Sequence, residues 1–422
     1  MRRMNANSVA ILSSAREATR SNDSHYRYRQ NSDFYYLTGF DEPEAIAVVA
    51  PAHKEHPFML FVRPRDPERE VWDGRRAGIE GARERYGADA AFTFAEFPEK
   101  LGDLINGAKH LYYRVGEDTV LDEQIIKQIA GMRTLGRRGV QAPESITDPG
   151  TILHEMRLIK SEDEIKLMQR AADIAAEAHC EAMKATKPGM NEYEIEALIE
   201  YIFRRNGAAA PAYTSIVGGG ANATVLHYVS NNATLKDGDL LLIDAGAEYE
   251  GYASDITRTF PVNGRFTEAQ RGIYGLVLET QLACIEMVKP GVTMEGLRQH
   301  SIEMLTEGMV RLNLLEGETA KLIEEEKYKR FYMHGIGHYL GLDVHDVGRY
   351  QVDGEPRPVE AGVVMTIEPG LYVAEDAEEV PDKYRGIGVR IEDDVLVTSD
   401  GYRVLTGGVP KEIDEIEQLM KR

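Results

Sequence analysis

The sequence predicts an α/β domain followed by an α+β domain that contains an internal duplication. At 422 residues the chain is longer than one hydrophobic core usually organises, so two or three domains are expected. Short apolar runs alternate with helix-like segments in roughly the first third, and two sequence patterns each occur twice in the remainder. We therefore predict an N-terminal α/β domain over residues 1–148 and a duplicated α+β domain over residues 149–422.

The N-terminal domain is predicted from short apolar runs whose length and β-branched content are typical of strands. These runs are Val9–Leu12, Ala45–Val49, Phe58–Val62 and Leu111–Val115. Helix-like segments at Gly81–Tyr86 and Glu96–Asn106 lie between the last two runs. Pro143 and the triplet Asp148-Pro149-Gly150 indicate a linker, which sets the predicted domain boundary.

The second domain is predicted to begin with a long helix. Ser161 and Glu164 have the spacing of a capping box, in which each side chain bonds the other residue's backbone N–H. Residues at helical spacing follow: Ile165, Met168, Ala172, Ala175 and His179.

Two patterns in this domain occur twice. Lys-Pro-Gly at 187–189 and at 289–291 each follows one helical segment and precedes another. Farther on, Gly238–Gly246 and Gly362–Gly370 each place an acid six residues after one glycine and two before the next. The acids are Asp244 and Glu368. Two helix–helix–strand–strand halves would bring these acids to equivalent positions, so we expect a site between the halves.

The first acid belongs to a predicted hairpin. Leu240–Ala247 is apolar except for Asp244, which indicates a buried strand. The loop Glu248–Gly251 and the strand Tyr252–Phe260 would place Asp255 directly opposite Asp244. Opposed residues project from the same face with Cβ atoms about 4.5–5.5 Å apart. Two carboxylates that close either share a proton or hold a cation between them.

The second half supplies two more acids in similar settings. Glu368 ends the apolar strand Val363–Ile367. Glu392 is expected within the strand Gly388–Thr398, with Arg390 on the same face, where it could neutralise Glu392.

A histidine completes the predicted metal site. His338 ends the segment His334-Gly335-Ile336-Gly337-His338, which lacks the glutamate of the helical zinc motif and contains glycines that disfavour a helix. The predicted metal ligands are Asp244, Asp255, His338, Glu368 and Glu392. They can hold two divalent ions, and an oxygen-rich set with one nitrogen favours manganese, cobalt, iron or zinc over copper. The alternative is that these acids are ordinary hydrogen-bonded or solvated groups, but their duplicated positions in apolar strands weaken it.

Composition excludes several partner classes. The formal net charge of −21 argues against nucleic acid or an anionic membrane as the main partner. No stretch approaches the roughly 20 apolar residues that span a bilayer, and the N-terminus lacks the apolar region of a secretory signal. Cys180 and Cys284 form no Cys-x-x-Cys pair, which excludes a thiolate metal site. Two cysteines suit a reducing compartment, so we expect a cytoplasmic protein.

These segments resemble the metal-dependent pita-bread hydrolases and, within them, the aminopeptidase P family. The segments that carry the resemblance are Tyr28–Phe40, Leu242–Gly246, Ser254–Phe260, His334–His338, Thr366–Gly370 and Gly388–Asp393. The resemblance implies a pita-bread catalytic domain with two manganese ions, with cobalt or zinc as substitutes. It also implies release of the first residue of peptides that have proline second, by a cytoplasmic homo-oligomer, often a dimer or tetramer.

The resemblance assigns further residues to substrate binding. His227 and His345 match family histidines that contact the substrate near the metals, although a satisfied core or loop histidine is the ordinary alternative. The residues that resemble the wall of the proline pocket are His334, Tyr372 and Arg390. Trp72 resembles a residue that reaches toward a neighbouring subunit's site, and a buried tryptophan of the N-terminal domain is the alternative.

Together these features predict a metal-dependent exopeptidase. A hydroxide bridging the two ions would attack the scissile carbonyl, with Glu368 as general base and His345 or His227 stabilising the oxyanion. Asp244 and one ion would hold the free α-amine. Three alternatives remain: a prolidase, which cleaves Xaa-Pro dipeptides; a methionine aminopeptidase, which does not need residues 1–145; and a pita-bread binding protein, which has usually lost metal ligands.

Overall fold

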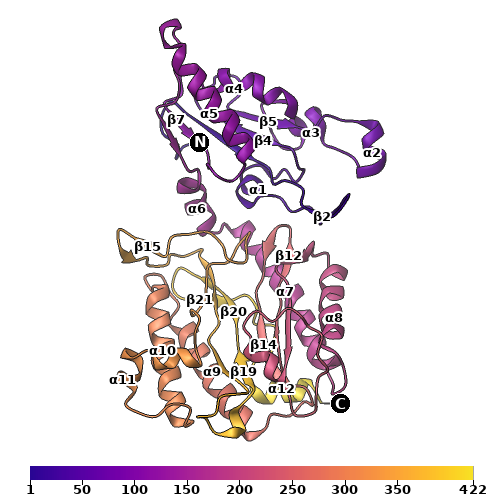
Figure 1. The fold of residues 1–422 in the computed structure, drawn as a ribbon, viewed down its shortest axis with the longest axis vertical. Coiled ribbons are helices and arrows are strands. Elements are labelled where there is room, and N and C mark those ends of the chain that lie inside the picture. The colour runs from indigo at the N-terminus through magenta and orange to yellow at the C-terminus, as the bar shows by residue number, and fades with distance from the viewer. Residues whose placement is uncertain (422) are drawn as a thin grey trace. The chain divides into compact units, whose positions relative to one another are not determined.

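The structure, a computed structural model, describes residues 1–421 and divides after Met156 into two compact units (Figure 1). The sequence places the boundary after residue 148, because Asp148-Pro149-Gly150 is typical of a linker. In the structure this triplet starts helix α6 (Gly150–Leu158), and the Asp148 carboxylate accepts a hydrogen bond from the Gly150 N–H at 2.7 Å. Helix α6 therefore continues across the point where the packing divides.

A six-stranded sheet of order β6-β5-β4-β1-β7-β8 organises the N-terminal unit. Its strands are β1 (Ser8–Ser13), β4 (Ile46–Val49), β5 (Phe58–Val62), β6 (Ala90–Thr93), β7 (His110–Tyr112) and β8 (Ser145–Thr147). Strand β4 is antiparallel to both neighbours, and the other pairs are parallel. The four runs predicted as strands form β1, β4, β5 and β7. Strands β6 and β8, which the sequence analysis did not predict, lie at the sheet edges and are at most half-buried.

Successive residues of β1 face two different cores. Val9 and Ile11 pack with helices α4 and α5, whereas Ala10 and Leu12 pack on the other face with α1 and α3. This period of two is what a strand covered on both faces requires. The helices are α1 (Ser32–Thr38), α2 (Pro67–Asp73), α3 (Gly78–Glu84), α4 (Phe97–Ile105) and α5 (Thr119–Thr134), and a short hairpin joins β2 (Thr19–Ser21) to β3 (Ser24–His25). The predicted helical segments overlap α3 and α4.

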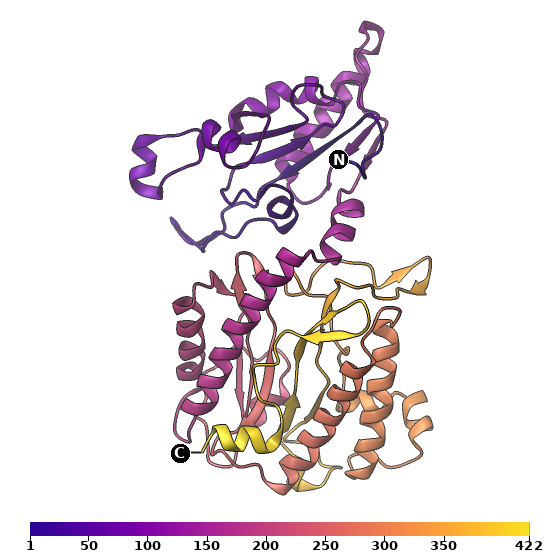
Figure 2. The ribbon, with the colours of Figure 1, turned by 180° about the vertical axis from the view of Figure 1, so that it is seen from behind.

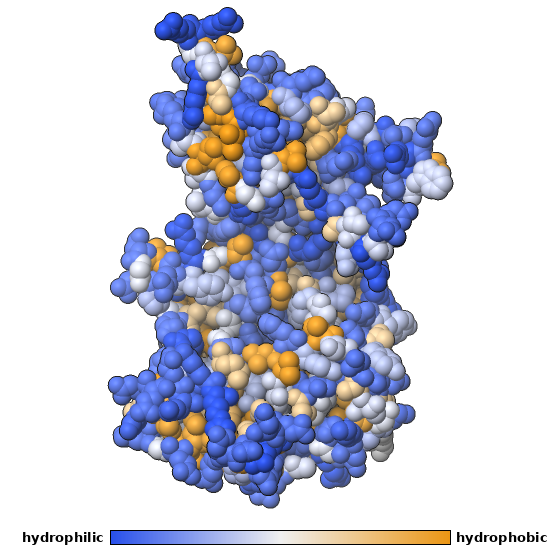
Figure 3. Space-filling view, viewed as in Figure 1, coloured by the Kyte–Doolittle hydropathy of each residue, from blue (hydrophilic) through white to orange (hydrophobic). Residues whose placement is uncertain are grey.

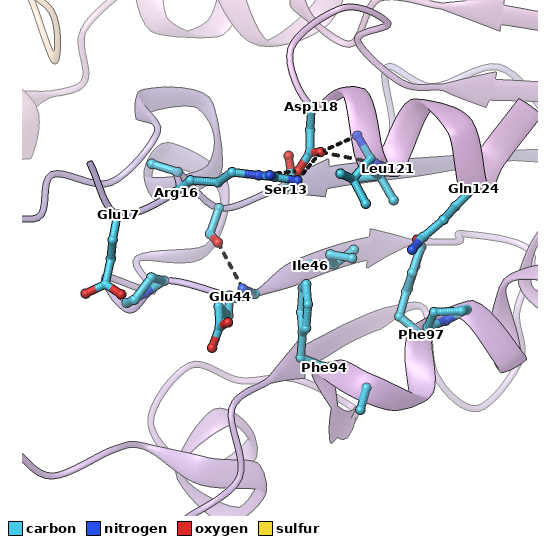
Figure 4. Close-up of a pocket in the computed structure, with 17 residues that line it drawn as sticks. Ser13, Arg16, Glu17, Glu44, Ile46, Phe94, Phe97, Asp118, Leu121 and Gln124 are labelled. Carbon is cyan, nitrogen blue, oxygen red and sulfur yellow. Dashed lines mark hydrogen bonds and ion pairs between the residues drawn. The ribbon is translucent and has the colours of Figure 1, made fainter. Parts of the chain in front are cut away.

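A cavity of about 470 Å³ opens in this unit where β1 ends and β4 begins, beside the first turns of α4 and α5 (Figure 4). Its apolar walls include Ile46, Phe94, Phe97 and Leu121. Its acids are Glu17, Glu44 and Asp118, and Arg16 forms an ion pair with Asp118. The described residues that line this cavity include no histidine or cysteine, so they offer no imidazole nitrogen or thiolate sulfur to a metal.

The second unit confirms the predicted duplication. Its first half runs α7 (Glu162–Ala185), α8 (Glu192–Arg205), β11 (Leu240–Asp244), β14 (Thr257–Pro261), and its second half runs α9 (Glu268–Met287), α10 (Met294–Arg311), β17 (Val364–Ile367), β20 (Asp393–Val397). The remaining strands are β9 (Ala210–Pro211), β10 (Ile216–Gly219), β12 (Ala247–Tyr249), β13 (Tyr252–Ala253), β15 (Gln351–Val352), β16 (Glu355–Pro356), β18 (Gly370–Val373), β19 (Ile387–Arg390) and β21 (Tyr402–Val404). Short helices α11 (Thr319–Glu324) and α12 (Ile413–Leu419) complete the unit.

The two halves also share their helix starts. The Ser161 side chain accepts from the Glu164 N–H while the Glu164 carboxylate accepts from the Ser161 N–H, as the sequence predicts. Thr267 and Gln270 make the same reciprocal pair at the start of α9. Equivalent helices therefore begin with equivalent caps.

Helices lie along one face of the strands. Figure 2, seen from behind, shows α7 and α9 in front of the strands, with α12 beside α7. Helix α7 contacts β12 and β13, and α9 contacts β17, β18 and β19. A large apolar core, including Ile174, Ile199, Ile243, Phe260 and Leu305, fills the space between the helices and strands. The helices thus occupy one face of the strands, and the strand ends carry the acids considered below.

The hairpin register differs from the sequence prediction. Asp244 pairs with Thr257, and Tyr249 pairs with Tyr252, so the turn is the two-residue Glu250-Gly251. The prediction that Asp255 lies directly opposite Asp244 is therefore wrong by two residues. Both Glu250 and Gly251 have positive φ angles, of 49° and 82°, which is the conformation that two-residue hairpin turns favour.

The predicted strand around Glu392 is interrupted. Strand β19 ends at Arg390 and β20 begins at Asp393, so Glu392 lies in the break and not within a continuous strand. At this break the two halves meet, because Thr257 forms an isolated antiparallel bridge with Glu392. The Thr257 hydroxyl donates to the Glu392 carboxylate at 2.6 Å. The interruption turns the Glu392 side chain into the site that both halves share.

The surface of the chain is predominantly polar. Figure 3 shows hydrophilic residues over most of the viewed face of each unit, with apolar residues in scattered groups. Among residues 1–421, no helix combines the length and apolar character needed to cross a bilayer.

Substituting Gly246 tests how tightly the hairpin closes. A Cβ at Gly246 would lie 1.7 Å from the Ser254 carbonyl oxygen, so we expect Gly246→Ala to shift backbone and cost at least about 1–3 kcal/mol of unfolding free energy. Gly275→Ala is the matched control, because a Cβ there meets nothing within 4 Å in helix α9 and should stabilise by about 0.5–1 kcal/mol. Urea unfolding followed by circular dichroism measures both. Equal stabilities of the two variants would contradict the close approach.

Candidate metal centre

One cavity of about 420 Å³ in the second unit collects most of the polar residues singled out by the sequence. Its lining includes Asp244, Asp255, Glu368, Glu392, His338, His227, His345, His334 and Arg390. The acids come from both halves. Asp244 ends β11 and Glu368 follows β17, which are equivalent strands of the duplication. The site therefore lies between the halves, where the repeated pattern placed it.

Three ligand atoms converge in this cavity. One ligand atom from each of Asp255, His338 and Glu392 lies within 4.8 Å of the other two, an arrangement that could hold a metal ion. The His338 Nδ1 faces the Tyr339 carbonyl oxygen at 3.1 Å, which leaves Nε2 toward the acids. His338 Nε2 lies 3.5 Å from Asp255 and 3.6 Å from Glu368. Such an orienting contact on the far nitrogen is typical of histidines that bind metals.

The segment that carries His338 is irregular, as its glycines predict. Gly337 lies so close to β17 that a Cβ would stand 2.0 Å from the Thr366 carbonyl oxygen. The Thr366 hydroxyl accepts a hydrogen bond from the His338 N–H at 3.1 Å. Glycine therefore lets this segment lie against the strand that leads to Glu368.

Asp244 is held by two side chains. Arg390 Nη2 donates to its carboxylate at 2.6 Å, and the Tyr213 hydroxyl donates at 2.6 Å. The same Tyr213 hydroxyl also contacts the Asp255 carboxylate. The sequence suggests that Arg390 could neutralise Glu392, but its direct ion pair is with Asp244. Tyr213 thus links the two acids that the hairpin brings near each other.

Burial and crowding change the proton affinities of these acids. Burial raises the pKa of Glu368 to about 7, although His338 and Arg390 act in the opposite direction. Burial, together with the neighbouring acids, raises the pKa of Glu392 well above its usual range. Burial also raises the pKa of Asp244, against the charge of Arg390. The raised pKa values mean that these buried carboxyl groups resist carrying negative charge so close together. A cation among their oxygens therefore strongly stabilises the ionised forms.

His338 and Asp255 shift in the directions of an ion pair. Burial alone would lower the pKa of His338, but the hydrogen bond and charge of Asp255, together with Glu368, raise it to about 9. Burial would raise the pKa of Asp255, but His338, with smaller contributions from Tyr213 and Arg390, holds that pKa below its usual value. His338 and Asp255 therefore attract each other as an ion pair at the place where their ligand atoms converge.

The donor set fits a divalent metal. The Glu392 Oε1 atom is buried and has no hydrogen-bond partner within the described residues. A buried carboxylate oxygen without a partner is costly, and a cation would satisfy it. Carboxylate oxygens with one imidazole nitrogen suit manganese, cobalt, iron or zinc. The cavity thus has the charge, the donors and the unsatisfied atom that a metal site requires.

Three further predicted residues form a connected wall. The Tyr372 hydroxyl contacts His334 Nε2 at 2.8 Å and accepts from Arg390 Nη1 at 3.0 Å. Tyr372 is buried behind His334 and Arg390 and is not itself among the cavity-lining residues. Burial lowers the pKa of His334 to about 4, with the charge of Arg390 acting in the same direction. His334 therefore presents a neutral ring to the cavity at neutral pH.

The two remaining histidines lie at the exposed side of the cavity. His227 and His345 both line it and are both solvent-exposed. The His345 ring packs edge-on against His338, with ring centroids 4.3 Å apart. Burial lowers the pKa of His345, and the neighbouring His338 acts in the same direction. Both histidines can reach a molecule bound over the carboxylates.

Trp72 does not belong to this cavity. It lies on α2 of the N-terminal unit, and its side chain is 85% exposed. The alternative of a buried tryptophan in the N-terminal domain is therefore wrong. The neighbouring Val71 is 82% exposed, so two large apolar side chains stand in solvent side by side.

Sequence reasoning missed the residues that support the acids from behind. The Asp394 carboxylate accepts from the Asp255 N–H at 3.0 Å. Arg258 donates to Asp393 at 2.7 Å and to the Glu392 carbonyl oxygen, and Lys411 donates to Asp393 at 2.7 Å. The only available signal was charge inside apolar strands, since Arg258 and Asp393 are fully buried.

Comparisons with known proteins agree with this geometry. Residues 166–399 match the model of metallopeptidase family M24, and residues 1–112 match that of the aminopeptidase P N-terminal domain. The chain is 46% identical over 418 residues to Xaa-Pro aminopeptidase of Escherichia coli strain K12, covering 99% of this chain and 94% of that protein.

Solved structures also match this chain over nearly its whole length. An aminopeptidase from Pseudomonas aeruginosa matches with a TM-score of 0.97 and 50% identity, covering 99% of this chain and 95% of that one. Zinc-substituted Escherichia coli aminopeptidase P in complex with product matches with a TM-score of 0.96 and 46% identity, again over 99% and 95% of the two chains.

Breaking the buried ion pair behind the site should destabilise the unit. The side chains of Arg258 and Asp393 are both 0% exposed, so Arg258→Met leaves Lys411 as the one cation paired with a buried carboxylate and is expected to cost about 3–5 kcal/mol. Arg271→Met is the control, because Arg271 is 40% exposed in its pair with Glu417 and should cost less than about 1 kcal/mol. Urea unfolding measures the difference. Similar losses for the two variants would show that burial of the pair is not decisive.

Proposed function

Because this chain belongs to the Xaa-Pro aminopeptidases of metallopeptidase family M24, we propose that the cavity between its two halves is the active site. The chain is a metal-dependent hydrolase that releases the first residue of peptides with proline in second position. The observation that carries the site assignment is the convergence of Asp255, His338 and Glu392 in a cavity that Asp244 and Glu368 also line.

We propose two metal ions per subunit, held by Asp244, Asp255, His338, Glu368 and Glu392. Supporting this number, the acids come as one pair from each half, and a single divalent ion would leave four buried carboxylates undercompensated. Manganese is the preferred ion, with cobalt or zinc as substitutes, because the donors are mostly carboxylate oxygens. When bound, the ions polarise the scissile carbonyl and lower the pKa of water.

Glu368 is the proposed general base. Proline's nitrogen leaves as a secondary amine, so it must receive a proton as the peptide bond breaks. The Glu368 carboxylate can accept a proton from the attacking water and pass it to this nitrogen. Its position at the end of β17 supports this role, because the carboxylate is fixed by the strand yet faces the cavity.

His345 and His227 are proposed to stabilise the tetrahedral oxyanion. Both stand at the exposed side of the cavity, where a carbonyl oxygen turned away from the carboxylates would lie. Donors aimed at charge that develops only in the transition state raise kcat more than they improve binding.

The His334, Tyr372 and Arg390 wall is proposed to hold the proline ring. Proline has no amide N–H, so recognition must depend on ring shape and apolar contact. The hydrogen bonds through the Tyr372 hydroxyl keep His334 and Arg390 in fixed orientations. Such a rigid wall can discriminate a cyclic residue from flexible ones.

The state of Arg390 favours an aminopeptidase over a prolidase. A prolidase must bind the carboxylate of the proline it releases, which requires an available cation. Among the described residues that line the cavity, Arg390 is the sole arginine or lysine. Its Nε, Nη1 and Nη2 already donate to Thr257, Tyr372 and Asp244. The pocket therefore offers no unengaged arginine or lysine to a dipeptide's carboxylate.

We also propose a homo-oligomer in which Trp72 contributes to a neighbouring subunit's site. The exposure of Val71 and Trp72 supports an interface there, because large apolar side chains in solvent are stabilised by a partner. The free thiols of Cys180 and Cys284 support a reducing compartment such as the cytoplasm.

Removing the metal should abolish activity. We expect chelation to stop hydrolysis of Ala-Pro-Ala, because the carboxylates alone cannot polarise the carbonyl, and manganese or cobalt to restore it. Metal content measured by mass spectrometry beside kcat should show about two ions per active chain. Full activity in protein shown to be metal-free would contradict the proposal.

Substrate length and the free amine should decide the specificity. We expect Ala-Pro-Ala and longer peptides to be cleaved at the Ala-Pro bond with kcat/KM at least comparable to that of Ala-Pro, because no free cation awaits the dipeptide's carboxylate. Acetylation of the amino terminus should block cleavage of every substrate. Cleavage of the dipeptide alone would make the chain a prolidase.

A further inference from the structure

His345 stands on a segment without regular secondary structure. Residues 341–349 form no helix or strand, and His345 is solvent-exposed. Its ring nevertheless lies at 72° to the His338 ring, with centroids 4.3 Å apart. A group that stabilises a transition state must be held to within a fraction of an ångström. The segment therefore needs an anchor other than a helix or a sheet.

A buried charge cluster lies directly behind this segment. The Asp346 carboxylate accepts from Arg157 and, at 3.0 Å, from Lys160 Nζ. Arg157 also donates to the Asp343 carboxylate at 2.7 Å. The side chains of Arg157, Lys160 and Asp346 are only 3%, 1% and 1% exposed. Water cannot screen charges at this depth, so the cluster fixes the position of Asp346 strongly.

The cluster is fastened to the framework that carries the metal ligands. The Lys160 N–H donates to the Gly362 carbonyl oxygen at 2.8 Å, just before strand β17. The Asp346 N–H donates to the Tyr339 carbonyl oxygen at 2.8 Å, one residue after His338. The cluster is thus tied to the backbone before β17 through Lys160 and to the residue after His338 through Asp346.

Gly341 makes room for the cluster. A Cβ at this position would lie 2.2 Å from Asp346 Oδ2 and 3.1 Å from Lys160 Cε. Any side chain here would push the carboxylate away from Lys160. The absence of a side chain at Gly341 therefore lets the segment pack directly against the cluster.

We propose that Asp346, held by Arg157 and Lys160, is a positioning residue that fixes His345 over the reacting carbonyl. Asp346 does not line the cavity, so it acts through its neighbour in the chain and not by touching substrate. The inference rests on the proposed role of His345 in the transition state. Loosening the cluster should consequently lower kcat and leave KM and metal content nearly unchanged.

The first test replaces one charge. Asp346→Asn keeps the size of the side chain but weakens both ion pairs, and we expect kcat for Ala-Pro-Ala to fall about 10–100-fold. Glu417→Gln is the matched control, because Glu417 accepts from Arg271 in an ion pair that lies outside the cavity lining. Thermal melting of both variants separates loss of folded protein from loss of turnover. A folded Asp346→Asn variant with wild-type kcat overturns the proposal.

The second test changes no charge. Gly341→Ala forces the Asp346 carboxylate from its place, and we expect the same fall in kcat with KM unchanged. This variant decides the question if Asp346→Asn fails to fold. Wild-type kcat in folded Gly341→Ala overturns the proposal.

The third test asks whether Asp346 acts through His345. We expect Asp346→Asn to lower kcat no further in a His345→Ala background, because the positioned group is already gone. Losses that multiply would overturn the proposal while leaving the role of His345 intact. Wild-type kcat in His345→Ala alone would instead refute the role of His345 and this inference with it.

Discussion

The repulsion among four carboxylates in one cavity is the constraint to which the rest of the catalytic unit is fitted. Asp244, Asp255, Glu368 and Glu392 line a space of about 420 Å³, and burial strengthens every interaction between them. Such a set is stable only with protons or cations among the oxygens. The same constraint that makes the site costly to fold favours divalent ions, because each one brings two positive charges to the carboxylates.

The protein's own arginine and lysine side chains do not supply the cations that the four carboxylates need. Arg258 and Lys411 neutralise Asp393, which points away from the cavity, and Arg157 and Lys160 neutralise Asp346. Among the described residues that line the cavity, Arg390 is the only arginine or lysine, and its three guanidinium nitrogens already donate to Thr257, Tyr372 and Asp244. The carboxylate oxygens therefore remain available to metal ions and to the free ammonium group of a peptide.

Local sequence patterns predicted the features of the fold and the site that depend on residues close together in the chain. An acid inside an apolar strand, repeated at the same offset from two glycines, identified Asp244 and Glu368 and the duplicated fold. The pattern could not give the hairpin register, because a two-residue turn and a four-residue loop both suit the glycine that follows Glu250. Nor could it find Tyr213 or Asp394, since each meets Asp255 only after distant segments pack together. The sequence left the burial of Trp72 open for a related reason: exposure of a tryptophan depends on neighbours that the local sequence does not name.

The carboxylates of the site lie at strands and its imidazoles lie on loops, and this difference has physical reasons. Carboxylates that must remain desolvated sit at the ends or edges of buried strands, as Asp244 does on β11 and Glu368 beside β17. The imidazoles proposed to meet a substrate lie on segments without regular secondary structure, and His334 lies among glycines that let its segment approach the strands. A loop gains reach but loses the rigidity that a sheet's hydrogen bonds provide. A buried ion cluster restores that rigidity without covering the loop, because it holds the segment from the side that substrate never reaches. The exposed His345, proposed to be catalytic, and the buried Lys160 are on this view two parts of one arrangement, because Asp346 follows His345 in the chain and binds Lys160.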